Sequence, residues 1–320
     1  MARFQLIRLD PLPGGAARTQ AFALDEGGRA CGEAGLAGNG THAVRWEPTG
    51  MPRDLDGDPS RWSRAIACNA TGVVVGEHGL ENPMGRRAFV WTEARGFRTL
   101  PPLPGDSQAW ANAVAADGRV AGASTGLGHR VTPVVWDTNG VPRALSVVAG
   151  RDAEVFAFRG AVIAGGTRTD DAPAHEDAFV GPVGGPYRRL GSVEPGTHSR
   201  ALGVNAAGTV VGYAEDEYRS QHAVAWGPGG VRKLGFRADG GADQASAVNE
   251  HGQIVGFAYH PDAHRLLAFL HEGGVTRDLN TLVDLVATGW RLEEATAISA
   301  QGFVVGNGSL YGNPRGFLLR

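Results

Sequence analysis

Three tryptophans have the side chains best suited to binding a flat or sugar-like ligand. Trp62, Trp110 and Trp290 each stand one to five residues before a pair of small residues such as Ala65 and Ala67. An indole at a concave site can stack on a planar molecule or on a sugar ring. Packing of each indole against a neighbouring loop is the alternative, because single apolar residues are common at protein surfaces. We expect the three tryptophans to rim a ligand site.

Charged and titratable residues fall near the same sequence positions. Arg64 and Arg200 stand immediately before a pair of small residues, and His198 precedes Arg200 by two residues. Glu154 and Phe156 replace the small pair in the most degenerate part of the chain. A carboxyl and an imidazole that approach one ligand can act as general acid and general base. We therefore predict Glu154 as the acid, His198 as the base and the two arginines as ligand-binding residues. Neutral drift in a tolerant segment is the alternative for Glu154.

No motif for a metal or a cofactor accompanies these residues. His260 and His264 have the spacing of a helical metal pair, but Pro261 argues against a helix there. The chain has no phosphate-binding loop, no dinucleotide-binding glycine pattern and no nucleophile elbow. Loop histidines such as His78 and His129 are expected to be solvated. We predict no metal and no cofactor.

A regular repeat determines where the candidate residues lie in space. Leucines recur at intervals of 44 to 46 residues, and glycines and tryptophans recur in phase with them. A period of this length is typical of repeat architectures. The leucines are Leu9, Leu55, Leu100, Leu145, Leu190, Leu234 and Leu279; the glycines are Gly32, Gly76, Gly122, Gly165, Gly212, Gly256 and Gly306; the tryptophans are Trp46, Trp91, Trp136 and Trp226.

Each repeat contains four short runs of apolar residues separated by Gly, Asn, Asp or Pro. The clearest repeat has runs at 199–205, 209–212, 222–226 and 231–234. Runs this short predict strands and not helices. Asn205 and Gly208 bracket the first turn, where Asn can cap a type I turn and Gly can adopt a positive φ. Small residues two apart in the first run are expected to share one face, so that neighbouring sheets can approach closely.

Seven units of four strands predict an all-β fold, a seven-bladed β-propeller of antiparallel blades. The last repeat lacks its fourth run, and a surplus copy, residues 4–9, stands at the N-terminus. We predict that this segment closes the last blade. An open β-solenoid would leave the surplus strand unexplained. The expected domain is single, 1–320, with a closing strand at 1–9 and repeats at about 16–60, 61–105, 106–150, 151–196, 197–241, 242–290 and 291–320.

Composition and charge argue against some classes of partner and indicate the cellular compartment. The formal net charge is −3, and no run of about 20 apolar residues occurs, so we expect no nucleic-acid partner and no membrane span. The first ten residues contain no long apolar stretch of the kind found in export signals. Cys31 and Cys68 lie in neighbouring repeats, and we expect both to be reduced. These features predict a cytoplasmic protein, and we expect a monomer.

The chain resembles the HAF repeat family, bacterial proteins called probable extracellular repeat proteins. The resemblance rests on Thr-His42-Ala-Val-Arg-Trp, Gln-His222-Ala-Val-Ala-Trp and Asn249-Glu-His-Gly-Gln-Ile-Val-Gly. It also rests on the C-terminal pattern from Asp278-Leu-Asn-Thr-Leu to Gly316-Phe-Leu-Leu, and it covers nearly the whole chain. It implies a β-propeller and structural roles for His42 and His222, and it implies no settled biochemical activity.

Three functions remain open from the sequence. The first is binding of a small molecule or sugar-like ligand at the aromatic-rimmed mouth of the central channel. The second is catalysis at the same mouth by a lyase, hydrolase or cyclase, such as one of secondary metabolism, that needs no cofactor. The third is a scaffold for protein partners, which predicts apolar loop tips, whereas most of these loops are polar.

Overall fold

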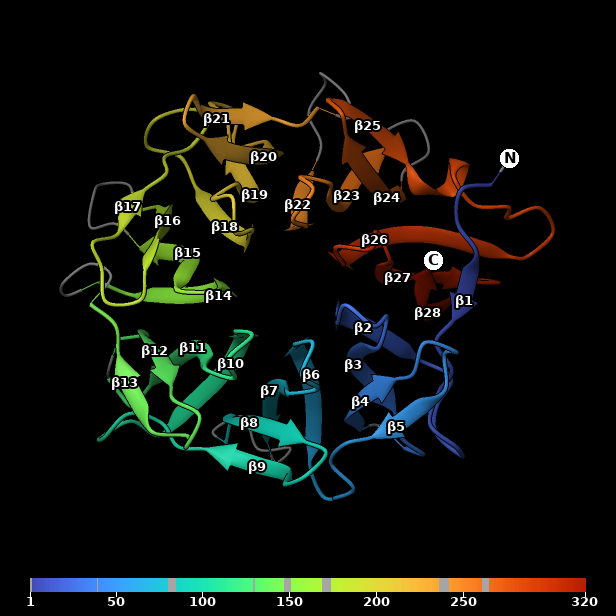
Figure 1. The fold of residues 1–320 in the computed structure, drawn as a ribbon, viewed down its shortest axis with the longest axis horizontal. Coiled ribbons are helices and arrows are strands. Elements are labelled where there is room, and N and C mark those ends of the chain that lie inside the picture. The colour runs from blue at the N-terminus through green and yellow to red at the C-terminus, as the bar shows by residue number, and fades with distance from the viewer. Residues whose placement is uncertain are drawn as a thin grey trace.

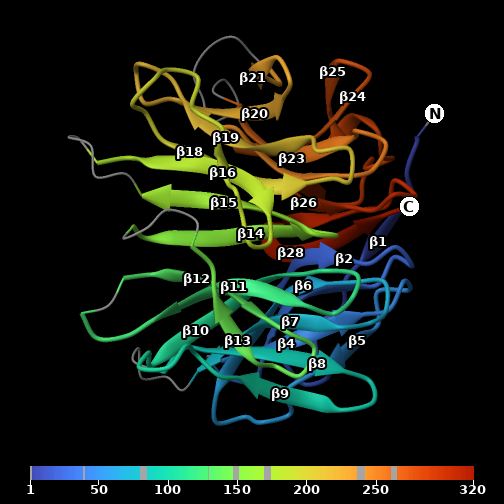
Figure 2. The same ribbon diagram turned by 60° about the vertical axis from the view of Figure 1, so that its left-hand side comes forward.

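Seven four-stranded antiparallel sheets surround a central axis and form a β-propeller (Figure 1). The computed structural model describes residues 2–38, 40–79, 85–128, 130–146, 151–168, 174–235, 242–260 and 265–320. Figure 2, turned by 60°, shows the blades as successive layers, with β14, β15 and β16 of blade 4 towards the viewer. The seven-bladed all-β architecture predicted from the repeat is confirmed.

Within each blade the strands follow one another outward from the axis. Blade 1 contains β2 (Thr19–Leu24), β3 (Ala30–Gly35), β4 (Thr41–Trp46) and β5 (Pro52–Asp54); blade 2 contains β6 (Trp62–Cys68), β7 (Val74–Gly79), β8 (Arg87–Thr92) and β9 (Gly96–Leu100). Blade 3 contains β10 (Gln108–Val114), β11 (Val120–Thr125), β12 (Thr132–Trp136) and β13 (Pro142–Ala144); blade 4 contains β14 (Ala153–Arg159), β15 (Val162–Arg168), β16 (Glu176–Pro182) and β17 (Arg188–Arg189).

The remaining blades repeat this order. Blade 5 contains β18 (Ser199–Val204), β19 (Val210–Glu215), β20 (Gln221–Gly227) and β21 (Gly230–Lys233); blade 6 contains β22 (Gln244–Val248), β23 (Ile254–His260), β24 (Arg265–Glu272) and β25 (Val275–Asp278). A short 3-10 helix, η1 (Leu279–Thr281), links blade 6 to blade 7, which contains β26 (Trp290–Ile298), β27 (Val304–Leu310) and β28 (Asn313–Leu319). Among the described residues, no helix is long and apolar enough to cross a membrane.

The N-terminal strand completes blade 7, as predicted. β1 (Leu6–Arg8) pairs with β28 in the register Leu6 to Leu319 and Arg8 to Phe317. Leu9, the first member of the leucine column, follows directly and is fully buried. The two ends of the chain therefore share one sheet, which removes an open edge from the last blade.

A β-bulge in every inner strand explains the glycine column. In blade 1 the pairing shifts between Ala21 and Ala23, which oppose the consecutive residues Gly32 and Cys31. A Cβ added to Gly32 would lie 1.9 Å from the carbonyl oxygen of Gln20. The equivalent distance is 1.9–2.0 Å in the other six blades, so only glycine fits. The two small residues therefore flank a bulge and oppose neighbouring residues, which corrects the expectation that they share a face.

The bulge also corrects the register expected for blade 4. The pair that flanks the bulge there is Val155 and Ala157, and Val155 pairs with Gly165. Glu154 and Phe156 were expected at these positions, so the expectation was wrong by one residue. Glu154 instead precedes the buried Val155, just as Arg200 precedes the buried Ala201 in blade 5.

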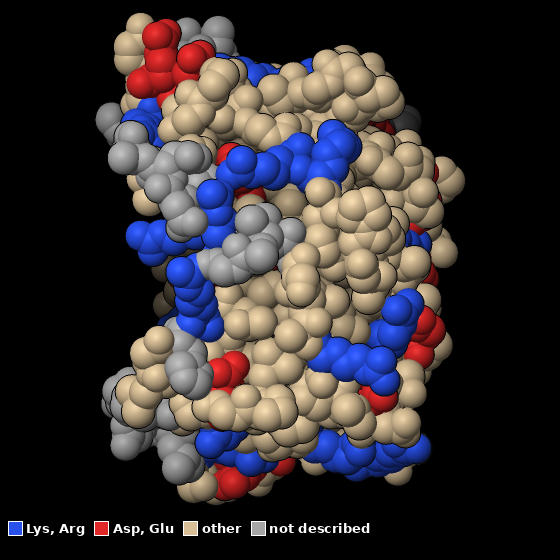
Figure 3. Space-filling view, turned by 90° about the vertical axis from the view of Figure 1, so that its left-hand side faces the viewer, with Lys and Arg blue, Asp and Glu red and all other residues tan. Residues whose placement is uncertain are grey.

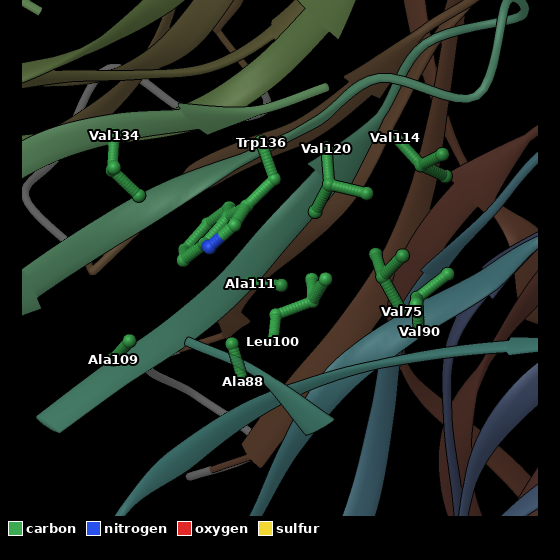
Figure 4. Packing of buried hydrophobic residues seen from close by; sticks show 10 residues of the cluster. All are labelled: Val75, Ala88, Val90, Leu100, Ala109, Ala111, Val114, Val120, Val134 and Trp136. Carbon is green, nitrogen blue, oxygen red and sulfur yellow. The ribbon is translucent and has the colours of Figure 1, made fainter. Parts of the chain in front are cut away.

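The apolar core lies between blades. One cluster joins Val75, Ala88, Val90 and Leu100 of blade 2 to residues of blade 3 that include Trp136 (Figure 4). The indole Nε1 of Trp136 donates to the carbonyl oxygen of Pro101, in the link after blade 2, at 2.7 Å. Trp136 therefore fills the interface between these two blades and satisfies its own polar atom, as a buried indole requires, and the indoles of Trp46 and Trp226 also donate to backbone carbonyl oxygens.

Asparagines at the first hairpin turn also bind one blade to the next. Asn249 accepts from two backbone N–H groups of its own turn through Oδ1, and its Nδ2 donates to the carbonyl oxygen of Ser299 in blade 7 at 2.9 Å. Asn205 makes the matching bond from blade 5 to Asn249 at 3.0 Å. The turn-capping role predicted for these residues is confirmed, and the link between blades is an addition to it.

Asn249→Asp is expected to destabilise the protein by about 1–3 kcal/mol, because it removes the donor that serves Ser299 and Gln253 and places a carboxylate oxygen beside these two acceptors. The acceptor side of the turn survives the change. Asn139→Asp, in an exposed turn, is the matched control and should alter stability by less than about 0.5 kcal/mol. Urea unfolding of both variants measures the difference, and equal stabilities would show that the amide donor contributes nothing.

Arginines protect the outer edges of the blades. Six outer strands or their ends carry arginine two residues before the leucine column, at Arg53, Arg98, Arg143, Arg188, Arg232 and Arg277. The side of the ring formed by blades 3 to 5 shows more Lys and Arg than Asp and Glu (Figure 3). Charge on an exposed edge strand discourages pairing with another copy of the chain.

Candidate functional site

One residue from each inner strand stands directly before the bulge. These seven residues are Gln20, Arg64, Trp110, Glu154, Arg200, Gln244 and Glu294. We call this set the inner ring, because the inner strands surround the centre of the propeller (Figure 1). Six of the seven are half-buried, and the residue that follows each is buried. Polar, charged or aromatic side chains thus occupy all seven equivalent positions.

In blades 2 and 3 the inner ring is held by alternating charges. Glu77, whose side chain is only 1% exposed, forms ion pairs with Arg64 and with Arg86. The guanidinium carbon of Arg86 lies 4.3 Å from the ring centroid of Trp110, within the range of a cation–π contact. Arg64 is therefore committed to Glu77, and Trp110 has one face covered by Arg86.

Glu154 receives two hydrogen bonds from blade 3. The indole Nε1 of Trp110 and the amide Nδ2 of Asn112 both donate to Glu154 Oε1, the second at 2.8 Å. Two donors on one oxygen fix the carboxyl group in place and present it as a hydrogen-bond acceptor. Trp110 therefore orients Glu154, although we expected it to stack on a ligand.

Arg200 is fixed by a bidentate ion pair. Its Nε and Nη2 atoms lie 2.9 and 2.6 Å from the two carboxylate oxygens of Glu176 in blade 4. Its guanidinium carbon lies 5.0 Å from the ring centroid of Phe156. Burial alone would lower the pKa of Arg200, but the hydrogen bond and charge of Glu176 outweigh burial, and the pKa is raised. Arg200 thus stays charged and joins blade 5 to blade 4.

His198 has a defined proton position when it is neutral. The backbone N–H of Glu176 donates to His198 Nδ1 at 3.2 Å. A ring nitrogen that accepts a hydrogen bond carries no proton, so the neutral ring holds its proton on Nε2. The geometry therefore suits His198 as a hydrogen-bond donor and not as the general base that we expected.

A cavity of about 280 Å³ lies where these groups meet. Its polar lining comes from Asp152, Glu154, Arg168, His175, Glu176, His198 and Arg200. Gly166, which pairs with Glu154, also lines it; a Cβ there would lie 1.8 Å from Glu176 Oε1. The equivalent residues are Glu77 in blade 2 and Tyr213 in blade 5. The missing side chain in blade 4 leaves room for Glu176 to reach Arg200. We call this cavity the blade 4 pocket.

The sequence-predicted site residues divide among several places. Glu154, His198 and Arg200 line the blade 4 pocket. Trp110 does not line it but donates a hydrogen bond to Glu154. Trp62 lines a separate cavity of about 790 Å³ beside blade 1. Trp290 lines a third cavity along the closing strand, and Arg64 belongs to the inner ring of blade 2.

The seven residues therefore do not line one cavity, contrary to expectation. Trp110 stands in the inner ring, whereas Trp62 lies two residues earlier in its strand. In β26 a second bulge, between Leu292 and Glu294, displaces Trp290 further. Residues at similar sequence distances from the pair of small residues do not occupy equivalent positions in space, because the inner strands differ in length and in the number of bulges.

Two carboxyl groups of blades 1 and 7 have shifted acidities. Burial raises the pKa of Glu33, although the charges of Arg64 and Arg18 oppose the shift. Burial also raises the pKa of Glu294, with a smaller opposing effect from a hydrogen bond to Asn307. Within the described ranges, no group of three or more His, Cys, Asp or Glu side chains is placed to hold a metal ion.

The repeat-motif histidines make structural hydrogen bonds. His42 Nδ1 lies 2.8 Å from Asp54 Oδ2, and its Nε2 lies 2.9 Å from the carbonyl oxygen of Asp58. Burial opposes the charged ring, but Asp54 outweighs it, and the pKa of His42 is raised. His222 Nε2 bonds Asp216 Oδ2 at 2.7 Å. Among the loop histidines, His78 is buried and its Nε2 lies 2.9 Å from Thr99 Oγ1, so the expectation of a solvated side chain was wrong for it. His129 and His264 lie outside the described residues.

The comparisons with known proteins identify the fold. No family model matches the chain, and no curated protein matches it. A streptogramin B lyase has a TM-score of 0.57 at 10% identity, covering 99% of this chain and 97% of that one. The β-propeller domain of the Trilobed protease from Pyrococcus furiosus has a TM-score of 0.60 at 8% identity, covering 94% and 95%. At these identities the likeness establishes the propeller architecture alone.

Proposed function

We propose that the protein binds a small polar molecule in the blade 4 pocket. The observation that carries the proposal is the convergence of Glu154, Glu176, His198 and Arg200 on a cavity in the most degenerate blade. Glu154 offers an acceptor held by Trp110 and Asn112, and His198 offers a donor. A few fixed polar groups in a concave site are typical of small-molecule recognition. A ligand that carries both hydroxyl or ammonium donors and an acceptor group would match this lining.

A catalytic role at the same pocket is the second candidate. Glu154, with its carboxyl held as an acceptor, suits removal of a proton from one atom and its return to another, and the Nε2–H of His198 suits a hydrogen bond to the negative charge that develops in between. Glu154 would then be the base, whereas the sequence led us to expect an acid. This arrangement would serve a lyase, hydrolase or cyclase that moves one proton between two atoms of its reactants.

The test begins with a thermal-shift panel of free amino acids, sugar acids and polyols on the purified protein. Glu154→Gln should then lower the affinity by about 10- to 100-fold for the ligands that stabilise the wild type, because a charged hydrogen-bond partner is lost. If the protein is an enzyme, the same substitution removes turnover while much of the affinity remains. Asp117→Asn, at an exposed turn of blade 3, is the control. Unchanged affinity and turnover in Glu154→Gln would refute both candidates.

The two cysteines support a proposal about the compartment. Cys31 and Cys68 are free thiols, and burial is the largest cause of the raised pKa of Cys31. A thiol held in its protonated form is a poor nucleophile. We propose that the protein works in a reducing compartment, as the sequence led us to expect. We also propose, from the sequence motifs, that the protein is a member of the HAF repeat family.

A further inference from the structure

Tyr311 has a backbone conformation that tyrosine rarely adopts. A two-residue turn, Tyr311 and Gly312, joins β27 to β28, and Leu310 pairs with Asn313 across it. The φ angles of Tyr311 and Gly312 are 49° and 81°. Two positive φ angles in a two-residue hairpin are typical of a type I′ turn, where Asn, Asp and Gly are favoured. A bulky aromatic residue there is an outlier, and such outliers cluster at functional sites.

The ring of Tyr311 is exposed and rests on backbone. The residue is 75% exposed, although it is a large apolar side chain. The ring lies over Gly289, since a Cβ added to Gly289 would be 2.3 Å from Tyr311 Cε1. The backbone N–H of Tyr311 donates to the carbonyl oxygen of Gly289 at 2.8 Å. The turn and Gly289 together hold the aromatic ring in an exposed position. Burial in the core therefore does not explain why a tyrosine stands at this turn.

This ring borders a groove of about 730 Å³, which we call the seam groove. Its lining includes Trp290, Leu310 and Tyr311, together with residues 4–8, which include the closing strand β1. Trp290 is fixed by an edge contact with Phe317, with ring centroids 6.4 Å apart. The polar lining includes Arg8, Asp10 and Thr288, and Arg8 Nε lies 2.6 Å from Asp10 Oδ1.

We propose that the seam groove binds a carbohydrate chain. The C–H face of a pyranose ring packs against the electron-rich face of an aromatic ring, and Tyr311 presents such a face. The guanidinium and carboxylate of Arg8 and Asp10 offer donors and acceptors to neighbouring hydroxyl groups. The site is separate from the blade 4 pocket, because the two cavities share no lining residue.

Ring closure and saccharide binding are coupled in this arrangement. The lining of the seam groove combines residues of β1 with Trp290 of β26 and Leu310 of β27, and β1 joins this sheet by pairing with β28. A ligand that contacts both β1 and the other strands binds only the closed ring, so it raises the apparent stability of the protein.

The experiment uses the full chain with cellohexaose, xylohexaose, chitohexaose and maltohexaose as probes, and binding is measured by calorimetry. At least one probe should bind and raise the melting temperature. Tyr311→Asn should lower the affinity for that probe by at least about 10-fold, because the aromatic face is lost. The same variant should melt at an unchanged temperature or about 2–4 °C higher, because Asn suits a type I′ turn.

Tyr218→Asn is the matched control, since Tyr218 is an equally exposed tyrosine, 80% exposed, in blade 5. It should leave saccharide affinity unchanged, and so should any block of the blade 4 pocket. Failure of all four probes to bind overturns the proposal. Equal affinity of the wild type and Tyr311→Asn overturns it as well.

Discussion

Removal of residues 1–9 is expected to lower the melting temperature by about 10 °C or more. Leu9 is fully buried, and β1 covers the edge of β28, where Leu318 and Leu319 are also fully buried. Burial of one leucine is worth about 2 kcal/mol, and exposing a buried strand edge adds to that loss. In a protein of this size each kcal/mol shifts the melting temperature by about 2 °C.

Calorimetry of the truncated chain beside Leu9→Ala and Arg8→Ala separates the contributions to ring closure. Leu9→Ala should cost about 2–5 kcal/mol, and Arg8→Ala, which keeps the strand, should cost little. A truncated chain that melts like the wild type would show that the ends of the chain do not close the ring.

Gly212→Ala is expected to destabilise the protein by about 3 kcal/mol or more. A Cβ at this position would lie 1.9 Å from the carbonyl oxygen of Arg200, which is backbone in the paired inner strand and cannot rotate away. The bulge would have to open, and Arg200 would move with it. Loss of stability should therefore be accompanied by weaker ligand binding at the blade 4 pocket.

Gly227→Ala is the matched control for this substitution. Gly227 lies in the same blade, at the end of β20, and an added Cβ would meet nothing within 4 Å. Its backbone φ is not in the left-handed region. Urea unfolding should find Gly227→Ala close to the wild type, and equal losses in the two variants would contradict the role assigned to the bulge.

The architecture was readable from the sequence because it repeats. Leu9, Leu55 and their equivalents recur at a constant interval, and the surplus N-terminal strand implied that the ring is closed by its own ends. The turn-capping role of Asn205 and Asn249 was likewise readable, because turn capping depends on residues that are close in the sequence.

The site was only partly readable, because its residues meet across blades. Glu154, His198 and Arg200 stood out as departures from the repeat, and they do line one pocket. Glu176 did not stand out, since its role depends on Gly166, ten residues away, lacking a side chain. The bulge set the register of Glu154, and its sequence signal, the glycine column that includes Gly165, was seen without being recognised as a sign of a bulge.

Trp290 shows why spacing failed for the tryptophans. Its distance from Ala295 suggested the channel mouth, but the extra bulge of β26 places it along the closing strand. The position of Trp290 depends on a bulge that the linear pattern does not contain. The outer arginines, such as Arg143 and Arg188, were also missed as a group, although they recur in phase with the leucine column, because their role follows from their place on exposed edge strands.

Binding at the blade 4 pocket is tested most directly by calorimetric titration of the wild type and Ala174→Trp. Ala174 is exposed and lines the pocket, so an indole there should fill the cavity without disturbing the core. The titrant is whichever amino acid, sugar acid or polyol stabilises the wild type most. We predict one site per wild-type chain and a loss of at least about 100-fold in affinity in Ala174→Trp at an unchanged melting temperature. Equal affinity in the two proteins would contradict the assignment of the ligand site to this pocket.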